Sequence, residues 1–84
     1  MYTIQFTRQA IKTLRKMSAN EAALIRSRIQ ELALNPFAVP NVKSLAGRPG
    51  YRLRIGDWRV IFEVAQNEQV ISILKIAQRG GAYR

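Results

Sequence analysis

The sequence contains no cysteine and no histidine. Without cysteine, the chain has no disulfide to stabilise its fold and no thiolate nucleophile, and it suits a reducing compartment. Without histidine, it lacks the side chain that most often acts as a general acid or base near neutral pH. Zinc and iron sites depend largely on these two residue types. We therefore expect no metal site and no cofactor.

Acidic residues are also scarce. Five Asp and Glu stand against fourteen Lys and Arg, which gives a formal net charge of +9 over 84 residues. So strong a positive field favours phosphate-rich partners or an acidic protein, and it accelerates association with either. We expect residues 1–84 to form one domain, because a chain of this length has room for a single hydrophobic core.

Long hydrophobic runs are missing as well. The apolar stretches are far shorter than the about 20 residues that a membrane-spanning helix needs, and the N-terminus lacks the continuous apolar segment of a signal peptide. We therefore expect a cytoplasmic protein without a membrane partner. Hydrophobic residues still make up 48% of the chain, which is enough for a packed core and too many for a disordered chain.

Residues 50–64 carry the clearest structural signal. Two apolar runs flank the pair Gly56-Asp57, and apolar side chains occupy alternate positions in both runs. Such alternation is typical of half-buried strands, and a Gly-Asp pair between them indicates an antiparallel hairpin. The residues predicted to face the core are Tyr51, Leu53, Ile55, Val60, Phe62 and Val64. The residues that then share the opposite face are Arg52, Arg54 and Arg59.

This arginine face has two interpretations. A run of charge is commonly a solvated surface that happens to be basic. The alternative is a surface for phosphates, because the planar guanidinium fork matches the geometry of phosphate oxygens. We prefer the phosphate surface, since arginines gathered on one patch of sheet repel each other and gain nothing from burial.

The first half of the chain predicts a strand followed by a helical hairpin. Residues 2–6 alternate like a short strand, and Thr7 can cap the helix that follows. Residues 18–21 form a capping box that begins a second helix, and Asn35-Pro36 ends it. The helix positions predicted to be buried are Ala10, Ile11, Leu14, Met17, Ala22, Ile25, Ile29, Leu32 and Ala33.

The remaining segments complete an α+β fold. Residues 42–45 suggest a short edge strand, and residues 70–77 suggest a central strand covered on both faces. We expect an N-terminal strand, an antiparallel helical hairpin and then a three- or four-stranded, mostly antiparallel sheet. The helices can cover one face of this sheet only, which leaves the arginine face on the other side.

Together, these segments resemble the toxins of the RelE/ParE superfamily, the poisons of bacterial toxin–antitoxin pairs. The resemblance spans nearly the whole chain and implies the small RelE-like fold. It rests on residues 2–7 with Ala10, Leu14 and Met17, on Asn35-Pro36, on residues 43–47, 51–54 and 56–64, on residues 76–79, and on Tyr83-Arg84.

The superfamily has branches with different activities. The RelE branch implies an mRNA interferase, a metal-independent endoribonuclease that cleaves messenger RNA in the ribosomal A site and so inhibits translation. The ParE branch implies inhibition of DNA gyrase, and a non-catalytic basic module that binds nucleic acid is a third alternative. Chain length favours the RelE branch, as does Arg79 followed by Tyr83. The implied partners are a cognate antitoxin, bound in a hetero-oligomer, and mRNA together with ribosomal RNA.

The RelE branch also implies roles for individual residues. Arg52 and Arg54 take the places of two catalytic basic residues, and Arg59 takes that of the arginine contacting the scissile phosphate. Arg79 matches the arginine near the leaving group, and Tyr83 matches the tyrosine that stacks on a nucleobase. The further residues expected to bind RNA are Lys43, Arg48 and Arg84.

The chain departs from this pattern at Arg52 and Arg54, where well-known members have lysine. A lysine amine crowded by other cations can lose its proton, whereas a guanidinium in practice keeps its own. The general base must therefore be sought elsewhere. Glu63 shares the strand parity of Arg59 and is a possible base, and a salt bridge with a neighbouring arginine is its alternative role.

Overall fold

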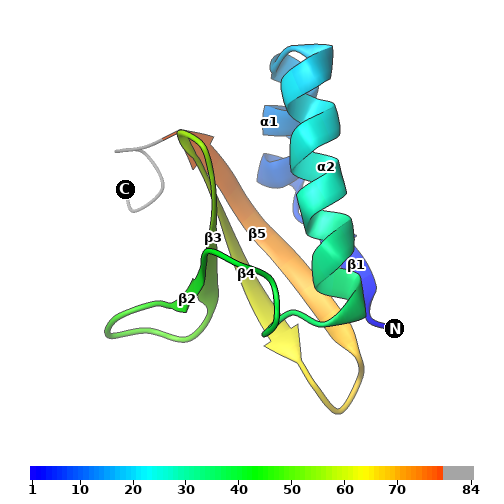
Figure 1. The fold of residues 1–84 in the computed structure, drawn as a ribbon, viewed down its shortest axis with the longest axis vertical. Coiled ribbons are helices and arrows are strands. Elements are labelled where there is room, and N and C mark those ends of the chain that lie inside the picture. The colour runs from blue at the N-terminus through cyan, green and yellow to red at the C-terminus, as the bar shows by residue number, and fades with distance from the viewer. Residues whose placement is uncertain (79–84) are drawn as a thin grey trace.

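The computed structural model describes residues 1–78, so residues 79–84 lie outside the described part of the chain. The elements are β1 (Thr3–Phe6), α1 (Arg8–Lys16), α2 (Ala19–Leu34), β2 (Val42–Ser44), β3 (Tyr51–Ile55), β4 (Trp58–Ala65) and β5 (Val70–Gln78). The strands form a 5-stranded sheet in the order β1-β5-β4-β3-β2 (Figure 1). β1 pairs parallel with β5, and the other neighbours pair antiparallel.

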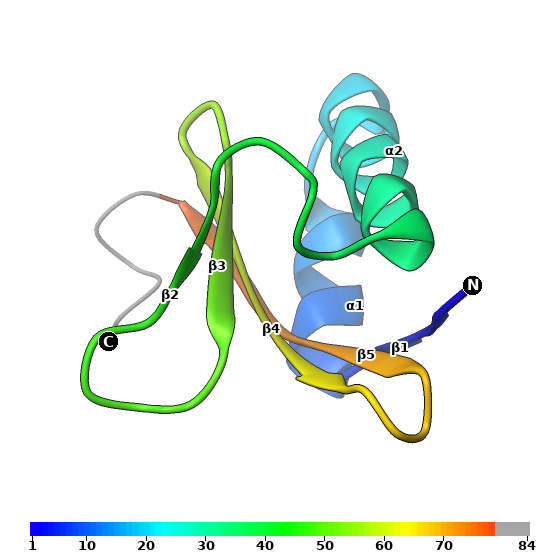
Figure 2. The ribbon, with the colours of Figure 1, turned by 60° about the horizontal axis from the view of Figure 1, so that its bottom comes forward.

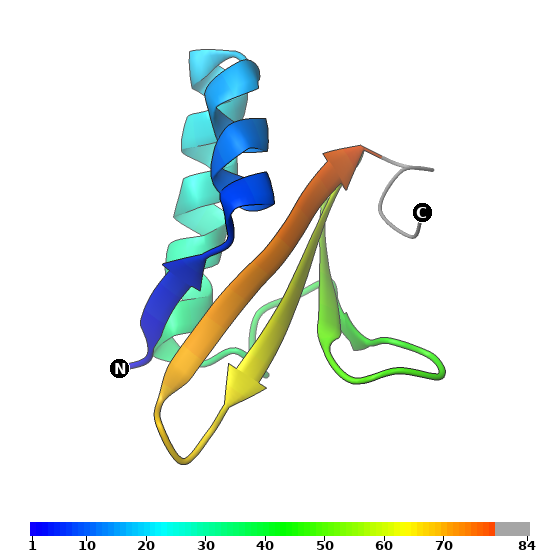
Figure 3. The same cartoon turned by 180° about the vertical axis from the view of Figure 1, so that it is seen from behind.

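The two helices lie side by side on one face of this twisted sheet (Figure 2 and Figure 3). The arrangement confirms the predicted α+β fold, with a helical hairpin followed by strands β2 to β5. The N-terminal strand joins the same sheet, which is therefore mixed and, as predicted, mostly antiparallel. The predicted edge strand at residues 42–45 is confirmed as β2.

Both predicted helix caps are formed. The Thr7 hydroxyl oxygen accepts the Ala10 N–H at 3.3 Å, and the Thr7 hydroxyl donates to the Leu74 carbonyl oxygen at 2.7 Å. The Ser18 hydroxyl oxygen accepts the Glu21 N–H at 3.2 Å. These bonds satisfy donors that the first turn of a helix leaves without a partner. The Thr7 cap also ties the start of α1 to β5, which sets the helix against the sheet.

The hydrophobic core lies between the helix pair and the sheet. Its largest fully buried side chains are Phe62, Ile25, Ile29, Leu32, Leu53, Ile71, Ile73, Ile76 and Val60. Fully burying one such side chain contributes roughly 1.5–3 kcal/mol. Because these residues come from α2, β3, β4 and β5, the core holds the hairpin predicted at residues 50–64 against the helices.

Ile11 departs from the predicted buried stripe of α1. Ala10 and Leu14 are buried, but Ile11 is 39% exposed. Residues at i and i+4 of a helix share one face, and here that face, with Ala10 and Leu14, meets the sheet. Ile11 is turned aside and lines a surface hollow between the helices, together with Phe6 and Ile29.

Strand β5 is central, as predicted, but it is not covered equally on both faces. The register shifts between Ile61 and Phe62 of β4, which leaves Leu74 as an extra residue of β5 in a β-bulge. Leu74 is the residue added at the bulge, and it breaks the strict alternation of the strand. On β5, Ile71, Ile73 and Ile76 are buried, whereas Ser72, Leu74, Lys75 and Ala77 are half-buried.

Candidate nucleic-acid-binding face

Cationic side chains gather on the face of the sheet opposite the helices. One cross-strand row consists of Lys43 in β2, Arg52 in β3, Ile61 in β4 and Lys75 in β5. The adjoining row consists of Arg54, Arg59 and Ala77. Directly paired residues share one face of a sheet, so we call Lys43, Arg52, Arg54, Arg59 and Lys75 the basic face. Neither row contains a carboxylate, and the prediction that the three arginines share a face is confirmed.

The β3–β4 turn places Arg54 opposite Arg59. Ile55 pairs with Trp58 and encloses the turn at Gly56-Asp57. Gly56 has a φ of +58°, which glycine adopts at little cost and which suits the first position of a tight hairpin turn. A turn this short fixes the strand register. The Cβ atoms of directly opposed residues lie about 4.5–5.5 Å apart, so the two arginines can engage one phosphate.

The Arg59 guanidinium is held by the hairpin turn. Its Nη1 donates to the carbonyl oxygen of Gly56 at 3.3 Å and to that of Trp58 at 3.2 Å. Arg59 is half-buried, whereas its neighbour Arg54 is exposed. The Arg54 backbone N–H donates to the carbonyl oxygen of Asn41 at 3.2 Å, which ties β3 to the start of β2. Arg59 is thus a preorganised cation, the kind that stabilises charge developing on an oxyanion.

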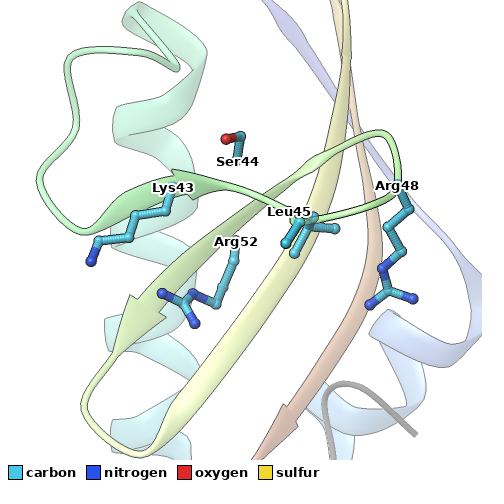
Figure 4. A pocket seen from close by; sticks show the side chains of 6 residues that line it. Lys43, Ser44, Leu45, Arg48 and Arg52 are labelled. Atoms are coloured by element: carbon cyan, nitrogen blue, oxygen red, sulfur yellow. The ribbon is translucent and has the colours of Figure 1, made fainter.

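A hollow of about 400 Å³ adjoins the basic face in the β2–β3 loop. Figure 4 shows Lys43, Arg48 and Arg52 on the same side of the chain, with Ser44 pointing the other way. A second hollow, of about 80 Å³, is lined by Asn41, Lys43, Arg52 and Arg54. Lys43 and Arg52 line both hollows, so the two hollows form one continuous cationic surface.

The loop that carries Arg48 depends on Gly50. The Leu45 N–H donates to the Gly50 carbonyl oxygen at 3.0 Å and closes the loop. Gly50 has a φ of +107°, and a Cβ atom there would lie 3.0 Å from the Phe62 carbonyl oxygen. Both its conformation and the close approach of β4 require glycine. The loop therefore returns tightly to β3, which keeps Arg48 and Arg52 around the same hollow.

Glu63 lies on the same face as Arg59 but toward the other end of β4. It pairs with Ser72, and the four-residue step from Arg59 spans about 13 Å of strand. Among residues 1–78, Glu63 forms no ion pair, so the salt bridge expected as its alternative role is not found there. Asp57 is nearer to Arg59 along the chain, and it lies exposed in the hairpin turn.

Lys75 belongs to the basic face, although alternation along the strand does not reveal it. The bulge at Leu74 shifts the parity of β5, so counting alternate residues from Ile71 does not give the face of Lys75. The sequence feature that could have revealed its position is a single lysine inside a strand that is otherwise almost wholly apolar. A charged side chain is costly to bury, and such a lysine therefore points away from the core.

The other predicted site residues lie outside the described part of the chain. Arg79, Tyr83 and Arg84 follow β5, and their roles stay predictions. Within residues 1–78, no cluster of acidic residues is arranged to hold a metal ion. In the same part of the chain, neither helix is long and apolar enough to cross a membrane.

Sequence comparison places the chain in a family. Residues 4–83 match the family described as "ParE toxin of type II toxin-antitoxin system, parDE". The RelE1 protein of Methanocaldococcus jannaschii is 29% identical over an alignment 86 positions long, which covers 99% of this chain and 96% of that relative. Because the family match spans nearly the whole chain, the protein belongs to the RelE/ParE superfamily of toxins from type II toxin–antitoxin systems.

Solved structures agree with this assignment. The archaeal RelE–RelB complex from Pyrococcus horikoshii contains a chain 30% identical to this one, with a TM-score of 0.82, covering 96% of this chain and 98% of that one. The intact Escherichia coli RelBE toxin–antitoxin complex contains a chain with a TM-score of 0.80 at 20% identity, covering 93% and 96% respectively. The second match supports the fold, and the predicted RelE-like architecture is confirmed.

Proposed function

We propose that this toxin is a ribosome-dependent mRNA endonuclease, an mRNA interferase that inhibits translation. The observation that carries the proposal is the pairing of Arg54 with Arg59 beside the row that contains Lys43 and Arg52. Guanidinium groups bind phosphate oxygens through paired hydrogen bonds. The two adjoining rows of cations can bind successive phosphates of one RNA strand. Arg54 and Arg59 then bind the phosphate at the cleavage site.

The proposed reaction is attack of a ribose 2′-oxygen on the adjacent phosphorus. The new O–P bond forms as the bond from phosphorus to the 5′-oxygen breaks, which leaves a 2′,3′-cyclic phosphate and a 5′-hydroxyl end. Hydrolysis of the cyclic product gives a 3′-phosphate. Cations at the phosphoryl oxygens stabilise the negative charge that develops there. Arg59 and Arg54 supply this charge, Arg79 assists the leaving oxygen, and Tyr83 stacks on a base.

No side chain is assigned to remove or donate the protons in this reaction. Glu63 lies about 13 Å of strand from Arg59, too far to reach a 2′-hydroxyl beside the same phosphate. We assign removal of the 2′-proton to solvent or to an RNA group, and the 5′-oxygen takes a proton from water. Such a site supplies charge and geometry only. The ribosome then supplies the in-line orientation of the mRNA, which is worth a large part of the rate.

The partners follow from the same surface. We propose mRNA in the ribosomal A site and ribosomal RNA as the ligands of the basic face and of the cations around Arg48. We also propose a cognate antitoxin that binds in a hetero-oligomer, which is supported by the RelB–RelE complexes among the solved relatives. The protein then acts in the cytoplasm, where its ribosomal target lies.

Primer extension on a reporter mRNA after toxin induction tests this proposal. We expect new 5′ ends inside the coding region within minutes, and the same ends when purified toxin meets ribosomes programmed with that mRNA. RNA without ribosomes should stay intact. Growth arrest with an uncut reporter would contradict the proposal.

The match to a ParE toxin family favours a second candidate function, inhibition of DNA gyrase. A supercoiling assay with purified gyrase separates the two, because an mRNA interferase leaves supercoiling unchanged. In cells, gyrase poisoning induces DNA-damage signalling, whereas mRNA cleavage stops translation first. If the protein binds RNA but neither cleaves mRNA nor inhibits gyrase, it is the non-catalytic module that binds nucleic acid.

A further inference from the structure

A hydrogen bond between Trp58 and Glu21 joins the tip of the β3–β4 hairpin to the helices. Trp58 Nε1 donates to Glu21 Oε2 at 3.0 Å, although the two residues are 37 positions apart in the chain. Trp58 is the first residue of β4, and Glu21 lies in the first turn of α2. The β3–β4 turn and the α1–α2 connection point toward the same end of the molecule (Figure 1). The bond therefore spans from sheet to helix.

Glu21 is a fixed anchor for this bond. Its Oε1 accepts the Ser18 hydroxyl at 3.2 Å, and its backbone N–H donates to the same hydroxyl oxygen at 3.2 Å. The bond from Trp58, followed by those from Ser18, lowers the pKa of Glu21 below its ordinary value of 4.5. The carboxylate is accordingly charged at neutral pH and tied to the N-cap of α2.

Trp58 links this anchor to Arg59. Its carbonyl oxygen accepts a hydrogen bond from Arg59 Nη1 at 3.2 Å, while its indole N–H binds Glu21. Its ring is half-buried and packs against the core. A continuous series of bonds thus runs from the cap of α2 through Trp58 to the Arg59 guanidinium.

We propose that Trp58 and Glu21 are positioning residues, which hold Arg59 and the opposed Arg54 in the orientation that RNA cleavage requires. A hairpin tip has few neighbours and is among the first parts of a sheet to bend or open. Tying it to a helix cap restricts that bending. A displacement of about 1 Å at a reacting group can cost about a hundredfold in rate. A single hydrogen bond that restrains the hairpin tip can therefore matter for catalysis, and we call the Trp58–Glu21 bond the clasp.

Four variants test the clasp. Trp58→Phe keeps an aromatic ring against the core but lacks the N–H, and Glu21→Ala removes the acceptor. Glu21→Gln keeps an acceptor oxygen for Trp58 and serves as the conservative rescue. Glu31→Ala is the matched control, because it removes another exposed carboxylate of α2, which is paired with Arg28 at 4.0 Å and takes no part in the Trp58–Glu21 bond.

The first readout is single-turnover cleavage of mRNA on ribosomes, measured with ribosome binding. We expect Trp58→Phe and Glu21→Ala to lower the cleavage rate by about ten- to a hundredfold at nearly unchanged affinity. Glu21→Gln and Glu31→Ala should stay within about threefold of the wild type, and a double variant that combines Trp58→Phe with Glu21→Ala should be no slower than the slower single one. Wild-type rates in Trp58→Phe, or an equal loss in Glu31→Ala, would overturn the inference.

The second readout does not depend on the proposed function. Hydrogen exchange of the Arg59 guanidinium, followed by NMR, reports directly whether the clasp holds that side chain. We expect several-fold faster exchange in Trp58→Phe and Glu21→Ala than in the wild type or Glu31→Ala. If the wild-type protein cuts no mRNA, the endonuclease proposal fails alone, and this exchange measurement still decides the clasp. Unchanged exchange in both clasp variants would refute it.

Discussion

Arg54 and Arg59 lie directly opposite each other across the β3–β4 hairpin, two like charges paired on one face of the sheet. Direct opposition of like charges destabilises a sheet. The pair therefore lowers the stability of the folded protein in the absence of an anion, a trade-off that is common where a binding site needs its charges close together. A phosphate bound between the guanidinium groups would relieve the repulsion.

Replacing either arginine of this pair should abolish toxicity without unfolding the protein. Each lost contact to the developing charge should cost about 2–4 kcal/mol, or roughly thirty- to a thousandfold in cleavage rate on ribosomes. Arg79→Ala should act in the same way. Arg15→Ala is a matched control, because Arg15 is an exposed arginine on α1. Full toxicity of Arg59→Ala and Arg79→Ala at equal expression would show that the site is elsewhere.

The same pair predicts opposite effects on stability and activity. Arg54→Ala should raise the free energy of unfolding by about 0.2–1 kcal/mol, since it removes the like-charge opposition. Arg59→Ala should raise the free energy of unfolding by less, because this variant also loses the hydrogen bonds to the turn carbonyls. Urea unfolding of both variants measures this difference. A marked loss of stability in Arg54→Ala would contradict the repulsion.

Lysine should partly replace arginine at positions 52 and 54. The proposed roles of Arg52 and Arg54 are charge and geometry, and lysine keeps the charge while losing the bidentate fork. We expect Arg→Lys variants to keep measurable single-turnover cleavage and the corresponding Arg→Ala variants to lose it. Equal loss in both would mean that the planar fork, rather than the charge, carries the role.

Glu63→Gln should change the cleavage rate by less than about tenfold. The amide keeps the shape of the carboxylate but takes no proton at neutral pH, and a lost general base usually costs about 10²–10⁴ in rate. Glu63 lies toward the far end of β4 from Arg59, which is why we expect the smaller effect. A drop beyond a hundredfold at unchanged ribosome affinity would make Glu63 the general base.

Association with the antitoxin should be fast and sensitive to salt. Acidic groups on an amphipathic helix or extended segment of the antitoxin would be steered by the net charge of +9. Stopped-flow measurements should show the association rate falling steeply between low and high salt, with a smaller change in dissociation. A flat association rate would argue against an encounter led by charge.

The Trp58–Glu21 bond should weaken on acidification. The folded protein lowers the pKa of Glu21 from its ordinary 4.5, chiefly through the bond from Trp58. Its ionised form thus contributes stability that is present above pH 4.5 and is lost as pH falls through the lowered pKa. In an NMR titration, the carboxyl carbon of Glu21 and the indole N–H of Trp58 should shift together, with a midpoint below 4.5. Trp58→Phe should move the Glu21 midpoint upward, and an unchanged midpoint would contradict the bond.

Much of the fold follows from local sequence. Thr7, Ser18 and Glu21 predict where the helices begin, because caps depend on residues within one turn. The Gly56-Asp57 turn and the alternation around it set the register of β3 and β4, because a short turn leaves little freedom of pairing. That register alone puts Arg52, Arg54 and Arg59 on one face, so the arginine part of the basic face was predictable.

The rest of the site depends on contacts between distant segments. Lys43 and Lys75 reach the basic face only because β2 and β5 pair on either side of the hairpin, with a bulge at Leu74 that alternation cannot reveal. The Trp58–Glu21 bond likewise joins residues 37 positions apart. Local hydrogen bonding and turn geometry determine residues that are neighbours in sequence. Strand order, bulges and the docking of helices are decided by packing the whole core, which no short stretch of sequence contains.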